Sequence, residues 1–248
     1  CLNSGSAHAA LSSSNFTAGD LSGEYTFSTW INMSTSSAGG NEKHIFNVRD
    51  MTSGESSARI FLTSGGDLWV YRNTVSSINP YRVQLSGFED NYSGSWVHLA
   101  ITDGGNANAW GNVKIYVNAV SQSVTSETRS GAYATLRLTG SSFVMCRGDN
   151  GTNFSPFNGK FDEITYWKSS LSAGNIKHLY NAGIALNFTA SNYGDYDGPN
   201  TLPETTNLFS WWSFDNLGSA PLDTGDIVTD VQGNCHLTVK DQYYDAMP

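Results

Sequence analysis

The feature that most constrains this chain is a short alternation of apolar and polar residues that recurs along most of its length. Alternation with a period of two predicts half-buried β-strands, and the Ser/Gly/Asn-rich clusters between them predict turns. We therefore expect an all-β chain, folded as a two-sheet antiparallel sandwich of the jelly-roll type. The predicted strands are YTFSTWINM (25–33), HIFNV (44–48), ARIFLT (58–63), DLWVYR (67–72), WVHLAIT (96–102), NVKIYVNAV (112–120), ATLRLT (134–139), SFVMC (142–146) and KFDEITYW (160–167).

One segment, LSAGNIKHLYNAG (171–183), breaks the alternation. Its apolar residues follow a helical spacing, Ser172 can cap the first turn, and Gly183 can end the last. The sequence therefore predicts one short helix in this part of the chain.

Charge and cysteine content exclude some classes of partner and of fold. The formal net charge of −9 argues against a nucleic-acid partner, because no basic stripe is present to neutralise phosphates. No apolar run approaches the roughly 20 residues that cross a bilayer, so we expect no membrane insertion. Cys1, Cys146 and Cys235 do not make a disulfide framework, although a bridge between Cys1 and Cys235 stays open. The first residue is Cys1, which indicates a start that is processed or incomplete.

The segment 157–183 resembles the laminin-G-like, concanavalin A-like lectin/glucanase jelly-roll family. Upstream, YTFSTWINM, WVHLAITDGG and VKIYVNAV resemble earlier strands of that family, with Ala119 where glycine is usual. The resemblance covers about residues 20–185 and implies the same sandwich. The family's G-x-x-D-E strand, Leu-Ser turn and Leu-Tyr-x-x-Gly helix correspond to Gly159, Asp162, Glu163, Leu171, Ser172, Leu179, Tyr180 and Gly183.

The two ends of the chain depart from the family pattern. A W-W-x-F-D strand and a D-x-x-G-N turn usually come first, whereas here they come last, at 211–215 and 230–234. We expect residues 1–188 to form the jelly roll and 189–206 a linker or wrapping arm. Residues 207–248 then either complete the same sandwich, which we favour, or open a further module. This late order resembles lectin-like structural proteins of phages and other viruses.

Catalysis is disfavoured by the pattern of acidic residues. The family's glycoside hydrolases carry a Glu-x-Asp-x-x-Glu run whose carboxylates share one strand face, and this chain has no such run. Asp162 and Glu163 are adjacent, so alternation predicts opposite faces. A Ser-His-Asp arrangement is not recognisable either, and His98 is interpreted as a structural histidine.

Calcium is the one cofactor that the resemblance implies, held by carboxylates and carbonyls at a loop rim. The candidate ligands are Asp149, Asn150, Asp162 and Asp103, with Asp195 and Asp197 as a second pair. The alternative interpretation is that these residues form turns with their own backbone.

Exposed aromatic side chains are candidate contacts for a glycan or a protein partner. We single out Trp110, which lies in a long polar loop, together with Trp69 and Tyr71. Trp211 joins them because alternation in NLFSWWSFDN sends Leu208, Trp212 and Phe214 to one face and Phe209 and Trp211 to the other. We expect Trp212 in the core and Trp211 covered by the 189–206 arm, a partner subunit or a ligand.

These observations favour a non-catalytic surface module. The leading hypothesis is a structural or recognition protein of a virion, such as a capsid decoration or fibre protein. Its expected partners are other virion or surface subunits, which would make an oligomer, and glycans. The alternative is a secreted, calcium-supported carbohydrate-binding or adhesion module, and a glycoside hydrolase is third. The expected location is a virion surface or the extracellular space.

Overall fold

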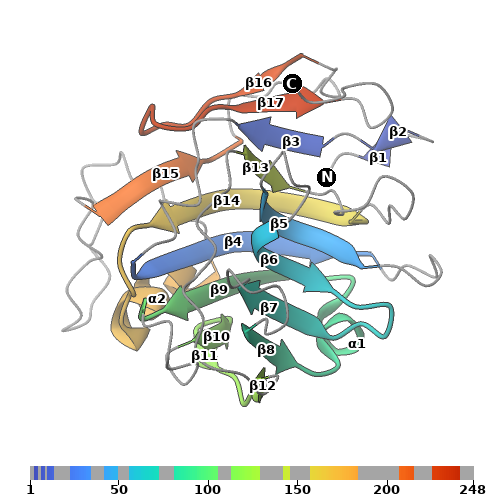
Figure 1. The fold of residues 1–248 in the computed structure, drawn as a ribbon, viewed down its shortest axis with the longest axis vertical. Coiled ribbons are helices and arrows are strands. Elements are labelled where there is room, and N and C mark those ends of the chain that lie inside the picture. Colours follow the sequence, from blue (N-terminus) through green and yellow to red (C-terminus); the bar gives the residue numbers. More distant parts are fainter. Residues whose placement is uncertain are drawn as a thin grey trace.

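The computed structural model describes residues 3–4, 7–8, 10–13, 23–34, 42–49, 56–72, 81–105, 113–128, 142–145, 157–183, 207–214 and 225–240. Two large sheets lie face to face, and every strand pairing is antiparallel (Figure 1). The predicted all-β sandwich is therefore confirmed.

The six-stranded sheet has the order β11-β10-β9-β4-β14-β15. Its strands are β4 (Tyr25–Met33), β9 (Trp96–Asp103), β10 (Lys114–Val117), β11 (Val120–Ser121), β14 (Gly159–Trp167) and β15 (Leu208–Trp212).

The nine-stranded sheet has the order β12-β8-β7-β6-β5-β13-β3-β17-β16. Its strands are β3 (Ala10–Ser13), β5 (Lys43–Arg49), β6 (Ser56–Leu62), β7 (Leu68–Arg72), β8 (Tyr81–Leu85), β12 (Thr125–Thr128), β13 (Ser142–Met145), β16 (Ile227–Val228) and β17 (Leu237–Lys240). A separate hairpin joins β1 (Asn3–Ser4) and β2 (Ala7–His8).

The main core fills the space between the two large sheets. Alternation turns one face of each strand inward, so that Phe27 of β4 meets Phe46 of β5 with ring centroids 5.1 Å apart. Ile60 and Val70 contribute from the nine-stranded sheet, and both are almost fully buried.

A second apolar layer covers the outer face of the six-stranded sheet. Helix α2 (Ala173–Tyr180) begins as predicted, since the Ser172 hydroxyl accepts a hydrogen bond from the Asn175 N–H at 3.1 Å. It ends at Tyr180, because the C-cap in the left-handed region is Asn181 and not the predicted Gly183, and a short 3-10 turn η3 (Asn181–Gly183) follows. The layer consists of Ala100, Tyr116, Trp167, Leu171, Ile176, Leu179, Leu208 and Trp211.

Two local expectations are wrong. The segment 112–120 is not one strand but a hairpin of β10 and β11, because Asn118 (φ 49°) and Ala119 (φ 64°) form a two-residue turn with both φ values positive. The sequence predicts a single helix, at 171–183, but a second helix, α1 (Phe88–Tyr92), lies before β9, where only a turn was expected. Phe88 is fully buried there, so tertiary packing stabilises a helix in a turn-like sequence.

The late W-W-x-F-D and D-x-x-G-N motifs meet in space. The Trp211 N–H donates to Asp230 Oδ1 at 2.8 Å, and the Val231 N–H donates to the Trp211 carbonyl at 2.8 Å. The indole of Trp212 donates to the Cys235 carbonyl at 2.8 Å. Strand β15 pairs with β14, and β17 pairs with β3, so strands from 207–240 extend both large sheets.

Several predictions fall outside the described residues: the strand at 134–139, the 189–206 arm, and Cys1 and Cys146. The division into 1–188, 189–206 and 207–248 accordingly stays a prediction. In the described ranges no helix is long and apolar enough to cross a membrane.

Candidate functional site

Two of the predicted calcium ligands, Asp103 and Asp162, lie in the described residues, and the fold does not bring them together. Asp103 is buried and accepts from Arg72 Nη1 at 2.6 Å and from the Gly105 N–H at 2.8 Å, which engages both of its oxygens. Asp162 Oδ1 accepts from the Glu163 N–H at 3.0 Å. Asp103 and Asp162 pair with positions five residues apart along β4, Tyr25 and Trp30, so roughly 17 Å of strand separates them.

These two carboxylates therefore cannot share one ion. Asp149, Asn150, Asp195 and Asp197 lie outside the described residues. Among the residues that are described, no group of three or more His, Cys, Asp or Glu side chains is placed to hold a metal. Calcium binding by the loop at 149–150 stays a prediction.

Trp211 is covered by the chain itself, so its proposed contact with a glycan or a partner is wrong for the folded monomer. The ring is 3% exposed, lies in the layer under α2, and donates its Nε1–H to Glu163 Oε2. Trp212 is fully buried in the main core, as expected.

The alternation predicted around these tryptophans fails at one position. Trp167 pairs with Leu208 while Tyr166 pairs with Ser210, so Phe209 is the extra residue of a β-bulge. The bulge sends Leu208 to the layer under α2 and lets Phe209 pack against the main core.

A second bulge changes the geometry of the adjacent carboxylates. Asp162 pairs with Trp30 and Thr165 pairs with Ser28, so two residues of β14 oppose Thr29. Glu163 adopts φ 47° at this bulge and is buried against Trp211. The prediction that Asp162 and Glu163 point to opposite faces of β14 therefore does not hold as simple alternation. The Glu163 carboxylate accepts the hydrogen bond of the Trp211 indole.

His98 lies between the six-stranded sheet and α2. Its Nε2 is 2.7 Å from the Ser28 hydroxyl, and its ring centroid lies 5.4 Å from that of Trp30 and 6.1 Å from that of Tyr180. Burial disfavours the imidazolium and lowers the pKa of His98 to about 3.

This burial predicts a loss of stability in acid. The folded chain keeps His98 neutral, whereas the unfolded chain binds a proton below its ordinary pKa of 6.5. The contribution is therefore complete above pH 6.5 and is lost as the pH falls from 6.5 towards 3. Between pH 7 and 4.5 we expect His98 to account for roughly 2–3 kcal/mol of the change in unfolding free energy. Urea denaturation of wild type and His98→Gln at both pH values measures it, and an equal pH dependence of the two proteins would contradict it.

Trp69 and Tyr71 lie on a different surface, the outer face of the nine-stranded sheet. Strand register places two transverse rows of side chains across β5, β6, β7 and β8, and the alternate residues enter the main core. We call these rows the arginine–aromatic face; it spans about 14 Å, three strand spacings. One row is Asn47, Arg59, Tyr71 and Arg82, and the other is His44, Phe61, Trp69 and Gln84.

The rings and guanidinium groups of this face stack on one another. The Arg59 guanidinium lies 4.3 Å from the Tyr71 ring centroid, and that of Arg82 lies 4.2 Å from the Trp69 centroid. Phe61 contacts both Trp69, at 5.8 Å between centroids, and His44, at 5.3 Å. Such stacking fixes long side chains in place and leaves the in-plane N–H groups of each guanidinium directed sideways.

On the arginine–aromatic face, the buried atoms His44 Nδ1, Asn47 Oδ1 and Trp69 Nε1 have no hydrogen-bond partner in the described part of the chain. Buried polar atoms are normally paired, because an unmet hydrogen bond costs about 1–3 kcal/mol. The indole can only donate and the amide oxygen can only accept, so the face holds one buried donor and one buried acceptor without partners.

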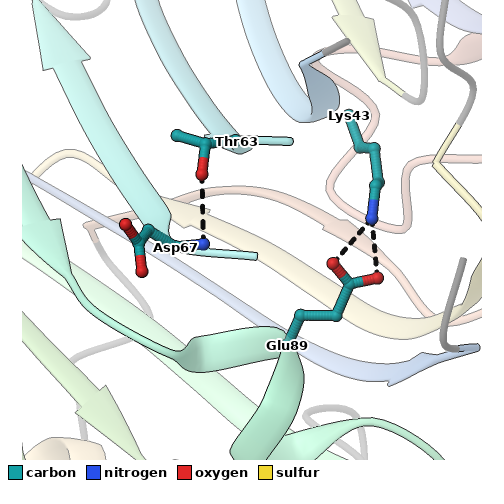
Figure 2. Close-up of polar contacts among 4 residues, drawn as sticks. All are labelled: Lys43, Thr63, Asp67 and Glu89. Carbon is teal, nitrogen blue, oxygen red and sulfur yellow. Dashed lines mark hydrogen bonds and ion pairs between the residues drawn. The ribbon is translucent and has the colours of Figure 1, made fainter. Parts of the chain in front are cut away.

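One end of the same strands is fixed by polar contacts with α1 and within the adjacent turn (Figure 2). Lys43, next to His44 on β5, directs its Nζ to both oxygens of Glu89 on α1, each at 2.6 Å. The Asp67 N–H donates to the Thr63 hydroxyl at 3.2 Å and closes the turn between β6 and β7. Asp67 also accepts from the Gly87 N–H at 2.7 Å. These contacts hold β5, β6 and β7 in register beneath the face.

Sequence reasoning found Trp69 and Tyr71 but missed their neighbours. Arg59 alternates with the buried Ala58 and Ile60, so its outward position was readable from the pattern. The pairing of Arg59 with Asn47 and Tyr71 could not be predicted from the sequence, because strand order is not a local property. Trp110, the fourth predicted contact, lies outside the described residues.

A protein-family model described as the concanavalin A-like lectin/glucanases superfamily matches residues 3–177. The chain belongs to this superfamily. A search of curated proteins found no match. Among solved structures, a candidate carbohydrate-binding protein from Bacteroides ovatus ATCC 8483 is similar over 94% of this chain, with a TM-score of 0.58 and 17% identity. This chain spans 57% of that protein.

Two other solved structures are similar to this chain at lower TM-scores. The binding domain of botulinum neurotoxin DC, in complex with rat synaptotagmin II, has a TM-score of 0.48 and 15% identity over 66% of this chain and 36% of its own. A heptameric SAP-like pentraxin from Limulus polyphemus has a TM-score of 0.47 and 13% identity over 73% of this chain and 78% of its own. At these identities the similarities concern the fold alone.

Proposed function

We propose that this chain is a non-catalytic carbohydrate-recognition module and that it binds glycans on the arginine–aromatic face. The observation that carries the proposal is the set of unpartnered atoms beside the rings, a donor at Trp69 Nε1 and acceptors at Asn47 Oδ1 and His44. A sugar hydroxyl both donates and accepts, while the apolar face of a sugar ring packs against an aromatic side chain. A few polar groups set among aromatic surface are typical of small-ligand sites.

Superfamily membership and the similarity to the Bacteroides candidate carbohydrate-binding protein support the same conclusion. The positions of the carboxylates support the absence of catalysis. Glu163 is buried under the Trp211 indole and Asp103 is paired with Arg72. Among the residues that the structure describes, neither is presented with a second carboxylate across an open cleft, as glycoside hydrolysis requires.

The experiment compares two tryptophans on different faces. Trp69→Phe keeps a ring but removes the unpartnered N–H, and we expect it to weaken glycan binding about fivefold or more. Trp96 is 44% exposed at the start of β9 in the other sheet, so Trp96→Phe is the matched control and should bind normally. A glycan array selects the ligand, and calorimetry then measures the affinity of each variant.

Two results would contradict the proposed glycan binding on this face. One is the absence of binding to any glycan by the wild-type chain. The other is an equal loss of affinity in Trp69→Phe and Trp96→Phe, with both variants folded by circular dichroism.

We propose that this binding takes place at the surface of a particle or cell, and the surface of a virion is our leading proposal. This rests on the late W-W-x-F-D and D-x-x-G-N order, which resembles that of viral structural proteins. The chain should then occur in stoichiometric amounts in purified particles. Its absence from particles, together with saturable glycan binding, would favour the secreted module instead.

A further inference from the structure

A carboxylate of the chain itself lies on the arginine–aromatic face. Glu42 immediately precedes β5, and its Oε2 is 3.1 Å from Arg59 Nη1 and 3.1 Å from His44 Nε2. The Glu42 side chain is 47% exposed, whereas those of Arg59 and His44 are 16% and 1% exposed. The two groups that hold the carboxylate are therefore covered, and the carboxylate itself reaches them from the solvent side.

Arg59 and His44 are held in place by aromatic stacking, while the Glu42 side chain is half exposed. Arg59 is stacked on Tyr71 and contacts the Phe61 ring at 5.1 Å, and His44 is stacked on Phe61. The hydrogen bond with His44, and then the charge of Arg59, lower the pKa of Glu42 against the opposing effect of burial, so the anion is the favoured form. A planar guanidinium held by stacking recognises a carboxylate with little further loss of side-chain entropy.

We propose that Arg59 and His44 form a subsite for the carboxylate of an acidic sugar, and that Glu42 occupies this subsite until the ligand displaces it. The inference rests on the proposed function, since it names the class of glycan that the same face selects. Trp69 and Asn47 then contact the hydroxyl groups and the ring, and Arg59 and His44 contact the acid.

The other charges of the face agree with this assignment. Arg82 lies over Trp69 and adds a second cation to the rows. Asp67 is engaged by the Gly87 N–H and by the Gln84 amide, at 2.7 and 2.8 Å. Because the whole chain carries a net charge of −9, general electrostatics repel an acidic ligand, and selectivity must arise from these local contacts.

The test uses oligouronides of several linkages and the same oligosaccharides after reduction of their carboxyl groups. We expect the wild-type chain to bind an oligouronide more tightly than its reduced, neutral counterpart. Glu42→Gln should raise affinity for the oligouronide by about two- to fivefold, the range of a partly exposed ion pair, and should raise affinity for the reduced form by less, since that form has no carboxylate to pair with Arg59. Arg59→Gln should lower affinity for the oligouronide by roughly tenfold or more.

Glu24→Gln is the matched control, because Glu24 is an exposed carboxylate placed before β4 on the other sheet. It should leave both affinities unchanged. Equal affinity for the acidic and reduced forms, or the same gain in Glu24→Gln as in Glu42→Gln, would overturn the acidic subsite. In that case binding of the reduced form that depends on Trp69 would still support the proposed function, so the two ideas fail separately.

Discussion

Asp230→Ala is expected to lower the free energy of unfolding by roughly 4 kcal/mol or more. The carboxylate is 1% exposed and accepts four backbone N–H bonds, those of Trp211, Gln232, Asn234 and Cys235, at 2.8–2.9 Å. Each buried N–H left without an acceptor costs about 1–3 kcal/mol, and water entering the site would recover part of that loss.

Urea denaturation followed by tryptophan fluorescence measures this effect, since the carboxylate accepts the backbone N–H of Trp211 in β15. Asp230→Asn retains one acceptor oxygen and should be less damaging. Asp90→Ala, an exposed carboxylate on α1, is the control and should change stability by less than about 0.5 kcal/mol. A loss below about 1 kcal/mol in Asp230→Ala would show that the four bonds are not what holds this turn.

Arg72→Ala is expected to destabilise the chain by about 3–5 kcal/mol. Arg72 of β7 and Asp103 of β9 form an ion pair of 2.6 Å between the two sheets, and both side chains are at most 4% exposed. Truncating one partner leaves the other charge buried alone, which is the costly outcome. The Tyr25 ring, 5.5 Å from the guanidinium, then faces an uncompensated carboxylate.

The double variant Arg72→Met, Asp103→Leu separates the pair from its packing. Because both charges are removed together, it should be much less destabilised than Arg72→Ala. Glu42→Ala breaks a partly exposed pair with Arg59 and should cost at most about 1 kcal/mol. Thermal or urea unfolding of the four proteins gives the comparison. If the double variant were as unstable as the single one, the loss would come from packing and not from charge.

Strand identity was predictable because alternation is a local property of the sequence. β4 has the predicted bounds, and most of the other predicted strands that are described agree within a few residues. Two of the features that were missed depend on contacts between distant segments. The Phe209 bulge follows from the register with β14, and α1 from burial of Phe88 and pairing of Glu89 with Lys43.

The candidate site divides in the same way. Trp69 and Tyr71 were found because alternation on one strand turned both outward. Their partners Arg59, His44 and Asn47 come from β5 and β6, and only the strand pairings place them in the same rows. Trp211 was misjudged because the sequence does not show that α2 folds back over it.

The pairing of β3 with β17 has a consequence for how the chain folds during synthesis. Ser12 pairs with Thr238, so β3 receives its second neighbour only after more than 220 further residues have been synthesised. Until then one edge of β3 stays open, and an open strand edge is prone to pair with another chain. Contacts between such distant residues also slow folding. Nascent chains of this protein should therefore depend on chaperones until residues 237–240 emerge and pair with β3.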